Sequence, residues 1–302
     1  MTATIKFKFN ILLPLAIVLI TLVLGFIITV YREKTQDLDR EFSLIATNIQ
    51  NSIETMATNH AKGFALALES ITRNKQLLDD FTGGNRDKLL ADITPTYEKL
   101  RNDFGITHLY FHDKNRLNFL RVHEPSMFGD VISRETLLTA ARTEKMSYGI
   151  EIGPLGMLAL RIVVPWRNEA ELIGYVELGE EISNLLLQAR TIFGIDFYVA
   201  LHQADLDNAE WQKGMAVLGR EGTWLKGWGY AITAQTISID PSVLFEAMAA
   251  EKNNSNPITA DIAMGSGKHR YQIGAIPLTD VNQRNVGKLL VLRDITSKAK
   301  SN

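Results

Sequence analysis

Two arginines stand inside otherwise apolar stretches of the sequence, and their side chains are suited to bind an anion. Arg121 lies within residues 117–123 and Arg161 within residues 158–166. An unpaired guanidinium in a buried strand is expensive, so each arginine must meet a carboxylate of the protein or of a ligand. A guanidinium can donate two parallel hydrogen bonds to one carboxylate, which makes an organic acid the natural ligand.

Carboxylates and polar-tipped aromatic side chains occur on the same predicted strands. Glu151 and Glu177 lie in apolar surroundings, so ion pairing inside the protein is the alternative to ligand binding. Neighbouring residues of a strand point to opposite faces, which limits how many side chains share one pocket. His112 is a further aromatic candidate. Beside the two arginines we expect a ligand pocket lined by Tyr148, Glu151, Tyr110, His123 and Trp166.

The residues give no support for catalytic or metal chemistry. The sequence contains no cysteine, which excludes thiol catalysis and thiolate metal sites, and it lacks the HExxH, GxSxG and Walker A patterns. His108 and His112 would share a strand face but lie about 13 Å apart, too far to hold one metal. His60 falls on an apolar helix stripe, which indicates a packed residue. We expect no enzyme activity, no metal and no cofactor.

The composition is that of an ordinary folded chain. It has 302 residues, of which 46% are hydrophobic, and this length suits about two domains. Lysine and arginine number 32 against 34 aspartates and glutamates, giving a net charge of −2. No surplus positive charge remains to neutralise a phosphate backbone, so we expect no nucleic-acid partner.

An uncharged stretch near the N-terminus predicts a membrane anchor. Residues 11–30 carry no charge, and at about 1.5 Å per residue they match the roughly 30 Å core of a bilayer. No small-residue cleavage site follows, and Tyr31 suits the membrane interface, so residues 11–31 are predicted as an uncleaved transmembrane helix after a cytoplasmic tail of residues 1–10. Basic residues flank both ends, so charge does not decide the orientation.

The segment after the anchor predicts a long helical stalk. From Leu38 to Ile71 apolar residues recur every three or four positions, near a heptad spacing at first. This pattern favours pairing with a second copy of the chain, as a homodimer. The helix is expected to end near residues 81–85, and a second helix with Pro95 inside it follows. Residues 32–104 are therefore assigned to a helical stalk and dimerisation region.

Beyond Gly105 the hydrophobic period becomes that of strands. Strands are predicted at residues 106–112, 117–123, 148–152, 158–166 and 172–178. A short helix is expected after Ser133, which can cap it. This order predicts an antiparallel sheet covered by helices, an α+β architecture of the PAS type, over residues 105–190.

Residues 191–296 roughly repeat this order of elements. Strands are predicted at residues 195–202, 223–226, 230–237, 258–264, 269–277 and 288–294. Asp240 and Pro241 mark the start of a helix that runs to about residue 252. The fold class is thus α+β, with two tandem modules and a polar tail of residues 297–302. An aromatic group is interpreted as module packing rather than a sugar platform: Trp211, Trp224, Trp228 and Tyr230.

Five stretches within residues 105–182 carry a family resemblance. They are HLYFHDKNRLNFLRVH (108–123), GD (129–130), YGIEIGPLG (148–156), LRIVVPW (160–166) and LIGYVELGEE (172–181). Together they resemble the membrane-distal half of a double Cache sensor domain, as found in bacterial chemoreceptors, sensor histidine kinases and diguanylate cyclases. The resemblance implies a membrane-distal module at residues 105–190 and a membrane-proximal module at residues 191–296. It also implies an inner-membrane protein with residues 32–302 in the bacterial periplasm.

The resemblance implies a sensor that binds a small ligand and relays its state to a signalling partner. A receptor of this type has a second membrane helix and an output domain after the sensor, whereas residues 297–302 hold no apolar stretch. We therefore expect either a stand-alone sensor that signals through another membrane protein or the front of a longer receptor. The alternative function is a docking module whose pocket is closed. The tyrosine, arginine, tryptophan and tyrosine signature of amino-acid-binding members is not evident.

Overall fold

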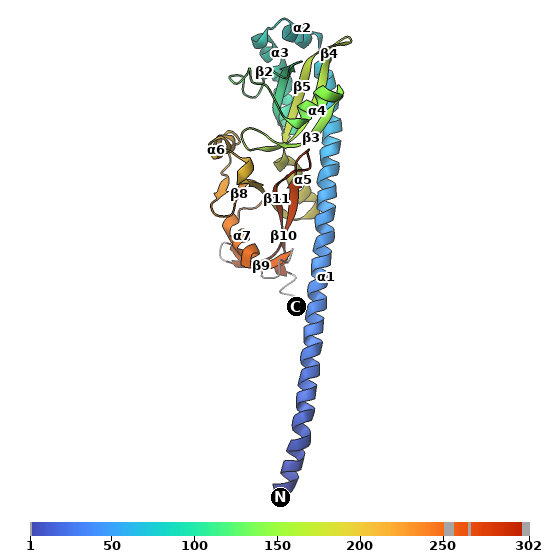
Figure 1. The fold of residues 1–302 in the computed structure, drawn as a ribbon, viewed down its shortest axis with the longest axis vertical. Coiled ribbons are helices and arrows are strands. Elements are labelled where there is room, and N and C mark those ends of the chain that lie inside the picture. The colour runs from blue at the N-terminus through green and yellow to red at the C-terminus, as the bar shows by residue number, and fades with distance from the viewer. Residues whose placement is uncertain (1, 251–256, 265–266, 298–302) are drawn as a thin grey trace. The chain divides into compact units, whose positions relative to one another are not determined.

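The structure of the chain is a computed structural model that describes residues 2–250, 257–264 and 267–297 (Figure 1). The chain divides into two units, residues 1–47 and residues 48–302, and each is described by itself. The predicted tail beyond residue 297 and the predicted helix end at residue 252 lie outside the described residues.

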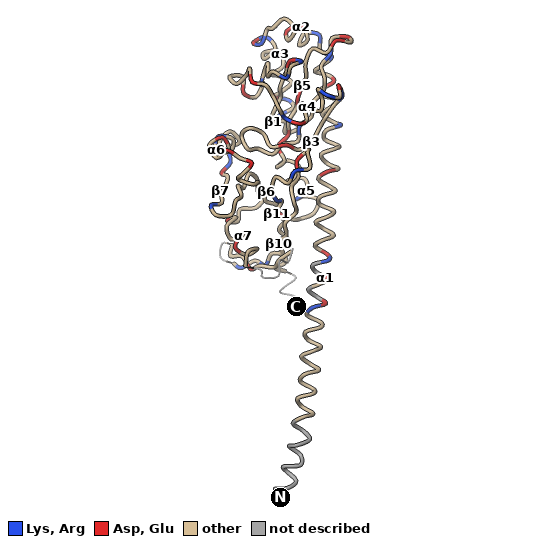
Figure 2. Tube along the Cα trace, viewed as in Figure 1, with Lys and Arg blue, Asp and Glu red and all other residues tan. Residues whose placement is uncertain are grey.

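A single helix, α1 (Thr2–Thr72), begins in the first unit and includes residues 2–10 of the predicted tail. Its stretch Pro14–Glu33 has a mean hydropathy of 2.5 and is long and apolar enough to cross a membrane. Figure 2 shows the described part of this stretch almost free of charged residues. The hydroxyls of Thr21 and Thr29 each donate to the carbonyl four residues earlier, at 2.8 Å. Both polar groups are thus satisfied within the helix, as an apolar environment requires.

The amphipathic helix ends earlier than the sequence predicts. Helix α1 stops at Thr72, and α2 (Lys75–Thr82) begins after Asn74. The Asn74 side chain accepts hydrogen bonds from two backbone N–H groups of the next turn, at 2.9 and 3.3 Å. The prediction of one helix that ends near residues 81–85 is wrong because this cap begins a new helix while the apolar spacing continues.

Five antiparallel strands form the first sheet, in the order β2-β1-β5-β4-β3. Helix α3 (Arg86–Phe104) precedes them and ends at Gly105, whose φ of 71° is the left-handed conformation that glycine favours. The strands are β1 (Ile106–Asp113), β2 (Asn118–Arg121), β3 (Ser147–Ile152), β4 (Leu158–Asn168) and β5 (Glu171–Glu181). Helix α4 (Glu135–Thr143) follows Arg134 at the N-cap position, so the expected cap by Ser133 is wrong.

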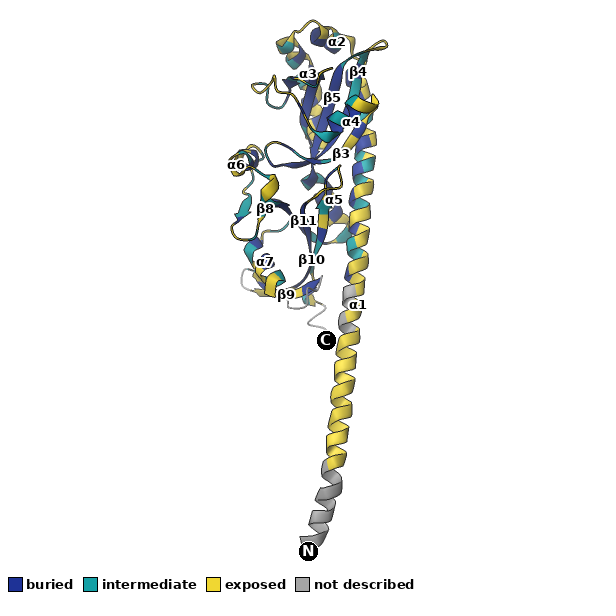
Figure 3. Cartoon of the chain, in the orientation of Figure 1, coloured by how far each residue is buried: buried dark blue, intermediate teal, exposed yellow. Residues whose placement is uncertain are grey.

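The two faces of this sheet differ in character. One face packs on α2 through large aromatic rings: Phe81 lies 4.8 Å from the ring of Trp166 and 6.4 Å from that of Phe111. Helix α4 packs on the other face, against Val163 and Tyr175. Figure 3 shows the strands as the most buried part of the module. The other face carries the charged side chains described below.

Six antiparallel strands form the second sheet, in the order β7-β8-β6-β11-β10-β9. Helix α5 (Ile182–Phe193) leads into it directly from β5. The remaining elements are β6 (Asp196–His202), the short 3-10 turn η1 (Gln203–Asp205), α6 (Asn208–Val217), β7 (Thr223–Leu225), β8 (Tyr230–Gln235), α7 (Pro241–Ala250), β9 (Ile258–Met264), β10 (Gly267–Thr279) and β11 (Asn285–Asp294). The prediction of two tandem modules with antiparallel sheets is confirmed.

The two modules contact each other at the edge strand β3. Val281, between β10 and β11, donates its backbone N–H to the Ile150 carbonyl of β3 at 2.9 Å. A Cβ on Gly149 would stand 2.4 Å from Cγ2 of Val281, so only glycine permits this approach. Beside it, Met157 packs on Trp211.

Two residues of the predicted aromatic group lie at this contact, since Trp211 and Trp224 belong to the same apolar cluster, with ring centroids 5.3 Å apart. The other two, Trp228 and Tyr230, pack on Phe245 in the core of the second module. The interpretation of this aromatic group as module packing is confirmed.

Candidate functional site

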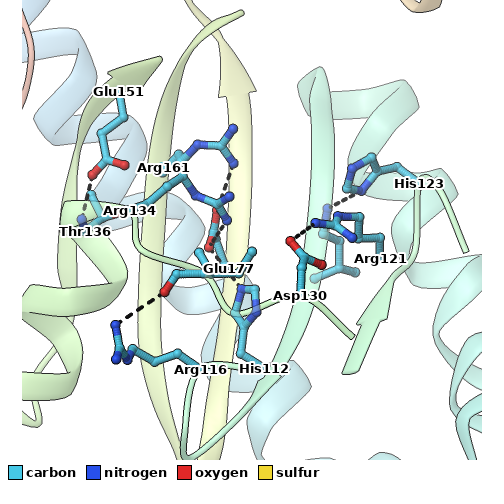
Figure 4. Close-up of polar contacts among 12 residues, drawn as sticks. His112, Arg116, Arg121, His123, Asp130, Arg134, Thr136, Glu151, Arg161 and Glu177 are labelled. Atoms are coloured by element: carbon cyan, nitrogen blue, oxygen red, sulfur yellow. Dashed lines mark hydrogen bonds and ion pairs between the residues drawn. The ribbon is translucent and has the colours of Figure 1, made fainter. Parts of the chain in front are cut away.

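The strand register brings the charged residues of four strands onto one face. Tyr110 stands opposite Arg121 of β2 on one side and opposite Glu177 of β5 on the other. Glu177 in turn pairs with Val163, two residues beyond Arg161 on β4. Residues that pair across an antiparallel ladder share a face, so these side chains form a row across the sheet. Figure 4 shows this row, with loop residues reaching into it.

Glu177 is the centre of the row and is fully buried. Nη2 of Arg134 lies 2.7 Å from both of its oxygens, and Nη1 of Arg161 lies 2.8 Å from Oε1 (Figure 4). The ring of His112 adds a contact from Nε2 to Oε2 at 3.1 Å. Burial raises the pKa of Glu177, but Arg134, the hydrogen bond from His112 and Arg161 together hold it well below its usual value. Glu177 is therefore ionised, and two guanidiniums share its one charge.

Three arginine side chains surround the ring of Tyr110. The guanidinium carbons of Arg134, Arg121 and Arg161 lie 5.0, 5.7 and 5.8 Å from the centre of its ring. At these distances the negative face of the ring attracts each guanidinium. Its ring also meets that of His123 edge-on, with centroids 4.7 Å apart.

The histidines around this ring contribute no positive charge at neutral pH. Burial holds the pKa of His108 well below its usual value and lowers that of His112. Burial, with Arg161 nearby, lowers the pKa of His123 to about 3. Since a carboxylate only accepts hydrogen bonds, neutral His112 donates from Nε2 to Glu177 and leaves Nδ1 as an acceptor. The positive charge of this face comes from the arginines.

Arg121 ties the loop of residues 122–134 to the sheet. Its Nη1 donates to the Met127 carbonyl at 2.8 Å, and its Nη2 meets Oδ2 of Asp130 at 2.7 Å. Burial raises the pKa of Asp130, but the hydrogen bond from Arg121 outweighs it and the net shift is downward. This loop follows strand β2 directly and leads to Arg134, so it lies beside the row of charges.

Glu151 lies at the outer edge of the row, on β3. Its Oε1 accepts the backbone N–H of Thr136, in the first turn of α4, at 2.5 Å. A helix leaves its first N–H groups without partners, and this carboxylate satisfies one of them. Burial raises the pKa of Glu151 despite that hydrogen bond and the nearby Arg161.

Five predicted pocket residues lie together on this face, and two do not. Arg121, Arg161, Tyr110, His123 and Glu151 share it. Tyr148 pairs with Ile162 and Trp166 with Gly174, so both side chains belong to the opposite face. The indole of Trp166 donates to the Thr72 carbonyl at 2.9 Å, on the helix side of the sheet. Placing Tyr148 and Trp166 beside Arg161 is wrong, because strand alternation turns them away.

Two residues at the centre of the site were not among the predicted ligand-binding residues. Glu177 was considered only as an internal partner for the arginines, and it does pair with Arg161. Arg134 lies in a loop just before α4, where no periodic pattern marks it. An arginine at the N-cap position, where a short polar cap residue is usual, was the available signal.

Several buried donors and acceptors of the site have no partner among the described residues. They include Nε of Arg161, Nε of Arg134 and Nδ1 of His112. Two guanidiniums with unused donors share the ionised Glu177, whereas burial raises the pKa values of the other two carboxyls that interact with Arg161, Glu151 and Glu181. The arrangement suits the binding of an anion that accepts several hydrogen bonds. In the described part of the chain, no group of three or more His, Asp or Glu residues is placed to hold a metal.

A family comparison identifies the class of protein. Residues 38–299 match the family described as "Double sensory domain of two-component sensor kinase", a double Cache family. The match covers most of the chain, and the chain belongs to this family. Such domains bind small ligands and signal to kinase or cyclase partners, and the family is one of sensors rather than enzymes.

Solved structures with similar architecture include three bacterial sensor domains. The sensor domain of the Vibrio cholerae histidine kinase DctB is 12% identical, with a TM-score of 0.45 over 84% of this chain and 98% of that one. The periplasmic domain of Vibrio cholerae LuxQ is 10% identical, with a TM-score of 0.47 over 82% and 99%. The ligand-binding domain of the Campylobacter jejuni chemoreceptor Tlp3, in complex with 4-methylisoleucine, is 10% identical, with a TM-score of 0.41 over 82% and 87%. A search of curated protein sequences finds no match.

Proposed function

We propose that this chain is a membrane-anchored periplasmic sensor whose membrane-distal module binds a small carboxylate ligand. Helix α1 supplies the anchor through Pro14–Glu33, and the ligand binds on the charged face of the first sheet. Arg134 and Arg161 donate hydrogen bonds to the ligand carboxylate above the ring of Tyr110. The binding protein performs no chemistry on the ligand and passes its state to a signalling partner or to an output domain.

The observation that carries the proposal is the sharing of Glu177 by two buried guanidiniums. One ionised carboxylate, Glu177, is thus shared by Arg134 and Arg161. Glu151 and Glu181 also interact with Arg161, but burial raises the pKa of both and so opposes their ionisation. Each of the two arginines also has an Nε that meets no acceptor in the described chain. An organic acid supplies both a negative charge and the missing acceptors, and planar bidentate recognition favours a carboxylate.

Ligand entry requires the loop of residues 122–134 to move. Arg161 is 1% exposed, so the ligand reaches it only when the covering segments open. The Arg121–Asp130 pair is suited to act as the latch, since Asp130 is half exposed and loop residues Met127 and Phe128 are exposed. Because its Asp130 end is open to solvent, this pair opens more easily than the fully buried Arg161–Glu177 pair.

The contact between modules supports a route for the signal. Glu151 and Gly149 share the charged face of β3, and Val281 of the second module packs on Gly149. A shift of β3 on ligand binding therefore reaches the turn between β10 and β11 directly.

A second copy of the chain is the expected partner for the stalk. Leu44 is 67% exposed on α1, on the part of the helix that follows the apolar stretch. Leu44 lies outside the near-heptad stripe, whose Ile49 and Ile53 are buried within the chain, so a second copy would pair through the exposed side of α1 that carries Leu44. We propose that the stalk forms a homodimer.

A thermal-shift screen of the full chain in detergent tests the proposal. The probes are mono-, di- and tricarboxylates at neutral pH, each paired with its uncharged amide. A carboxylate at a hundred times its Kd stabilises the folded state by about 2.7 kcal/mol, and the matching amide does not. The variant Arg161→Met should lose this shift, while the matched exposed variant Arg167→Met, on the same strand, should keep it. Equal shifts with acids and amides, or no shift at all, would refute the proposal.

A docking module is the second candidate function. The loop beside the site exposes Met127, Phe128 and Val131 by 52%, 58% and 61%. Three exposed apolar side chains within five residues are typical of a surface that another protein covers. A flat screen on well-folded protein would favour this function, with the buried arginines serving only to hold the loop.

A further inference from the structure

A cavity opens on the side of the first sheet that faces away from the arginine row. It is a groove of about 570 Å³ between α1, α3 and α5, at the end of β5. Phe64, Leu100 and Glu180 form its buried floor, and Asn59, Phe104 and Gln188 stand exposed at its mouth. The groove shares no lining residue with the arginine site.

Strand alternation explains why one strand serves two sites. Glu177 and Glu180 are three residues apart on β5, so they point to opposite faces. Glu180 therefore stands at the floor of the groove, with 1% of its side chain exposed. Its Oε2 lies 2.7 Å from Nδ1 of His60, and burial raises its pKa despite that contact.

The acidic side chains that line the groove are Asp103 and Glu180. No lysine or arginine is among the residues that line it. Asp103 lies at the rim and pairs with Lys99 at 2.7 Å, so Glu180 is the carboxylate without a permanent cation. The apolar part of the lining includes two aromatic rings, Phe64 and Phe104. A protonated amine satisfies a buried carboxylate, and aromatic faces favour a cation next to them.

Gly63 keeps the groove open. It lies inside α1, where glycine is among the least favourable residues for a helix. A Cβ added at Gly63 would meet no atom of the described chain within 4 Å. Packing within the chain therefore does not demand a glycine there, whereas a larger side chain would project into the cavity.

We propose that this groove is a second ligand site, which binds a small protonated amine with an apolar body and uses Glu180 as its counter-ion. The ammonium lies at Glu180 and His60, and the apolar part fills the space beside Gly63 between the two phenylalanines. This site is independent of carboxylate binding on the other face, so the chain responds to two chemically opposite ligands.

The test uses 2-phenylethylamine as the probe and 2-phenylethanol as its neutral counterpart. Saturation-transfer NMR on the full chain in detergent at pH 7 measures the dissociation constant of each. We expect the amine to bind at least tenfold more tightly than the alcohol. The variant Glu180→Gln should weaken amine binding at least tenfold, and Gly63→Leu should abolish it.

Two controls keep the outcome specific. Glu171→Gln changes an exposed glutamate of the same strand and should leave amine binding unchanged, as should Arg161→Met in the other site. Because Gly63→Leu replaces a helix-interior glycine with a better helix former, its thermal midpoint should not fall. Equal binding of amine and alcohol, unchanged binding in Glu180→Gln, or no binding to the unmodified chain would overturn the proposal. Loss of carboxylate binding alone would leave it standing.

Discussion

Removing the carboxylate at the centre of the arginine row should be the most damaging single change in the first module. Glu177→Ala leaves Arg134 and Arg161 buried with no counter-charge, each less than 10% exposed. Breaking a buried pair by removing one partner costs about 3–5 kcal/mol. For a unit of this size each kcal/mol lowers the midpoint by about 2–4 °C, so we expect a fall of roughly 6–20 °C.

The same variant should be rescued by a small carboxylate. Alanine leaves a space where acetate can take the position of the lost carboxylate group between the two guanidiniums. At ten times its Kd, acetate would restore about 1.4 kcal/mol. Thermal unfolding of the full chain, followed by circular dichroism with and without sodium acetate, measures both effects, and sodium chloride at equal ionic strength is the control.

Two results would refute this reasoning. The first is a midpoint for Glu177→Ala that falls no further than that of Glu171→Ala, an exposed glutamate on the same strand. The second is rescue by chloride that equals rescue by acetate, since that would show general screening instead of a shaped carboxylate position.

Three further predictions concern the module contact, a buried glutamate and the stalk. Gly149→Val should push Val281 away and destabilise the second unit by about 1–3 kcal/mol, measured by urea unfolding, because the added side chain overfills the contact. Burial raises the pKa of Glu181 to about 7 in the folded protein. The carboxyl is therefore harder to ionise in the folded than in the unfolded chain, and the folded state loses stability as pH rises from about 4.5 to 7. Glu181→Gln should therefore gain about 3 kcal/mol at pH 8 and nothing at pH 4, in urea unfolding at both values. Leu44→Cys should form an intermolecular disulfide on mild oxidation, visible on non-reducing gels, since the chain has no other cysteine.

Each of these has a matched control. Gly267→Val, at an exposed strand position where an added Cβ meets no atom nearer than 3.8 Å, reports the general cost of adding a side chain to a glycine, and an equal loss would refute the contact. A gain for Glu181→Gln that is the same at both pH values would show that ionisation is not the cause. Cross-linking of Gln212→Cys, on an exposed helix face of the second module, at the same rate as Leu44→Cys would contradict pairing through the stalk.

The elements of the fold followed from sequence because their signals are local. Alternation marked the strands around Arg121 and Arg161, and the uncharged stretch marked the apolar part of α1. Because side chains alternate between the two faces of a strand, the odd spacing of five residues also predicts that Trp166 lies on the face opposite Arg161. Tyr148 and Glu151 are three residues apart on one strand, so their side chains lie on opposite faces for the same reason.

The centre of the site depended on information that a single sequence does not display. Arg134 reaches Glu177 across a loop, and no spacing rule connects residues that far apart in the chain. The end of α1 at Thr72 was hidden because apolar residues continue at helical spacing into α2. The groove at Glu180 required three helices to be placed together, although the buried glutamate itself lay in the strand that the sequence marked.

Hydrogen exchange of the full chain, followed by mass spectrometry, tests the central claim most directly. The probe is the carboxylate that gives the largest thermal shift, compared with its amide. We predict slower exchange in residues 108–134, which hold β1, β2 and the covering loop, and unchanged exchange in residues 258–264 of the second sheet. Protection confined to the second sheet, or equal protection by acid and amide, would contradict a carboxylate site at Arg134 and Arg161.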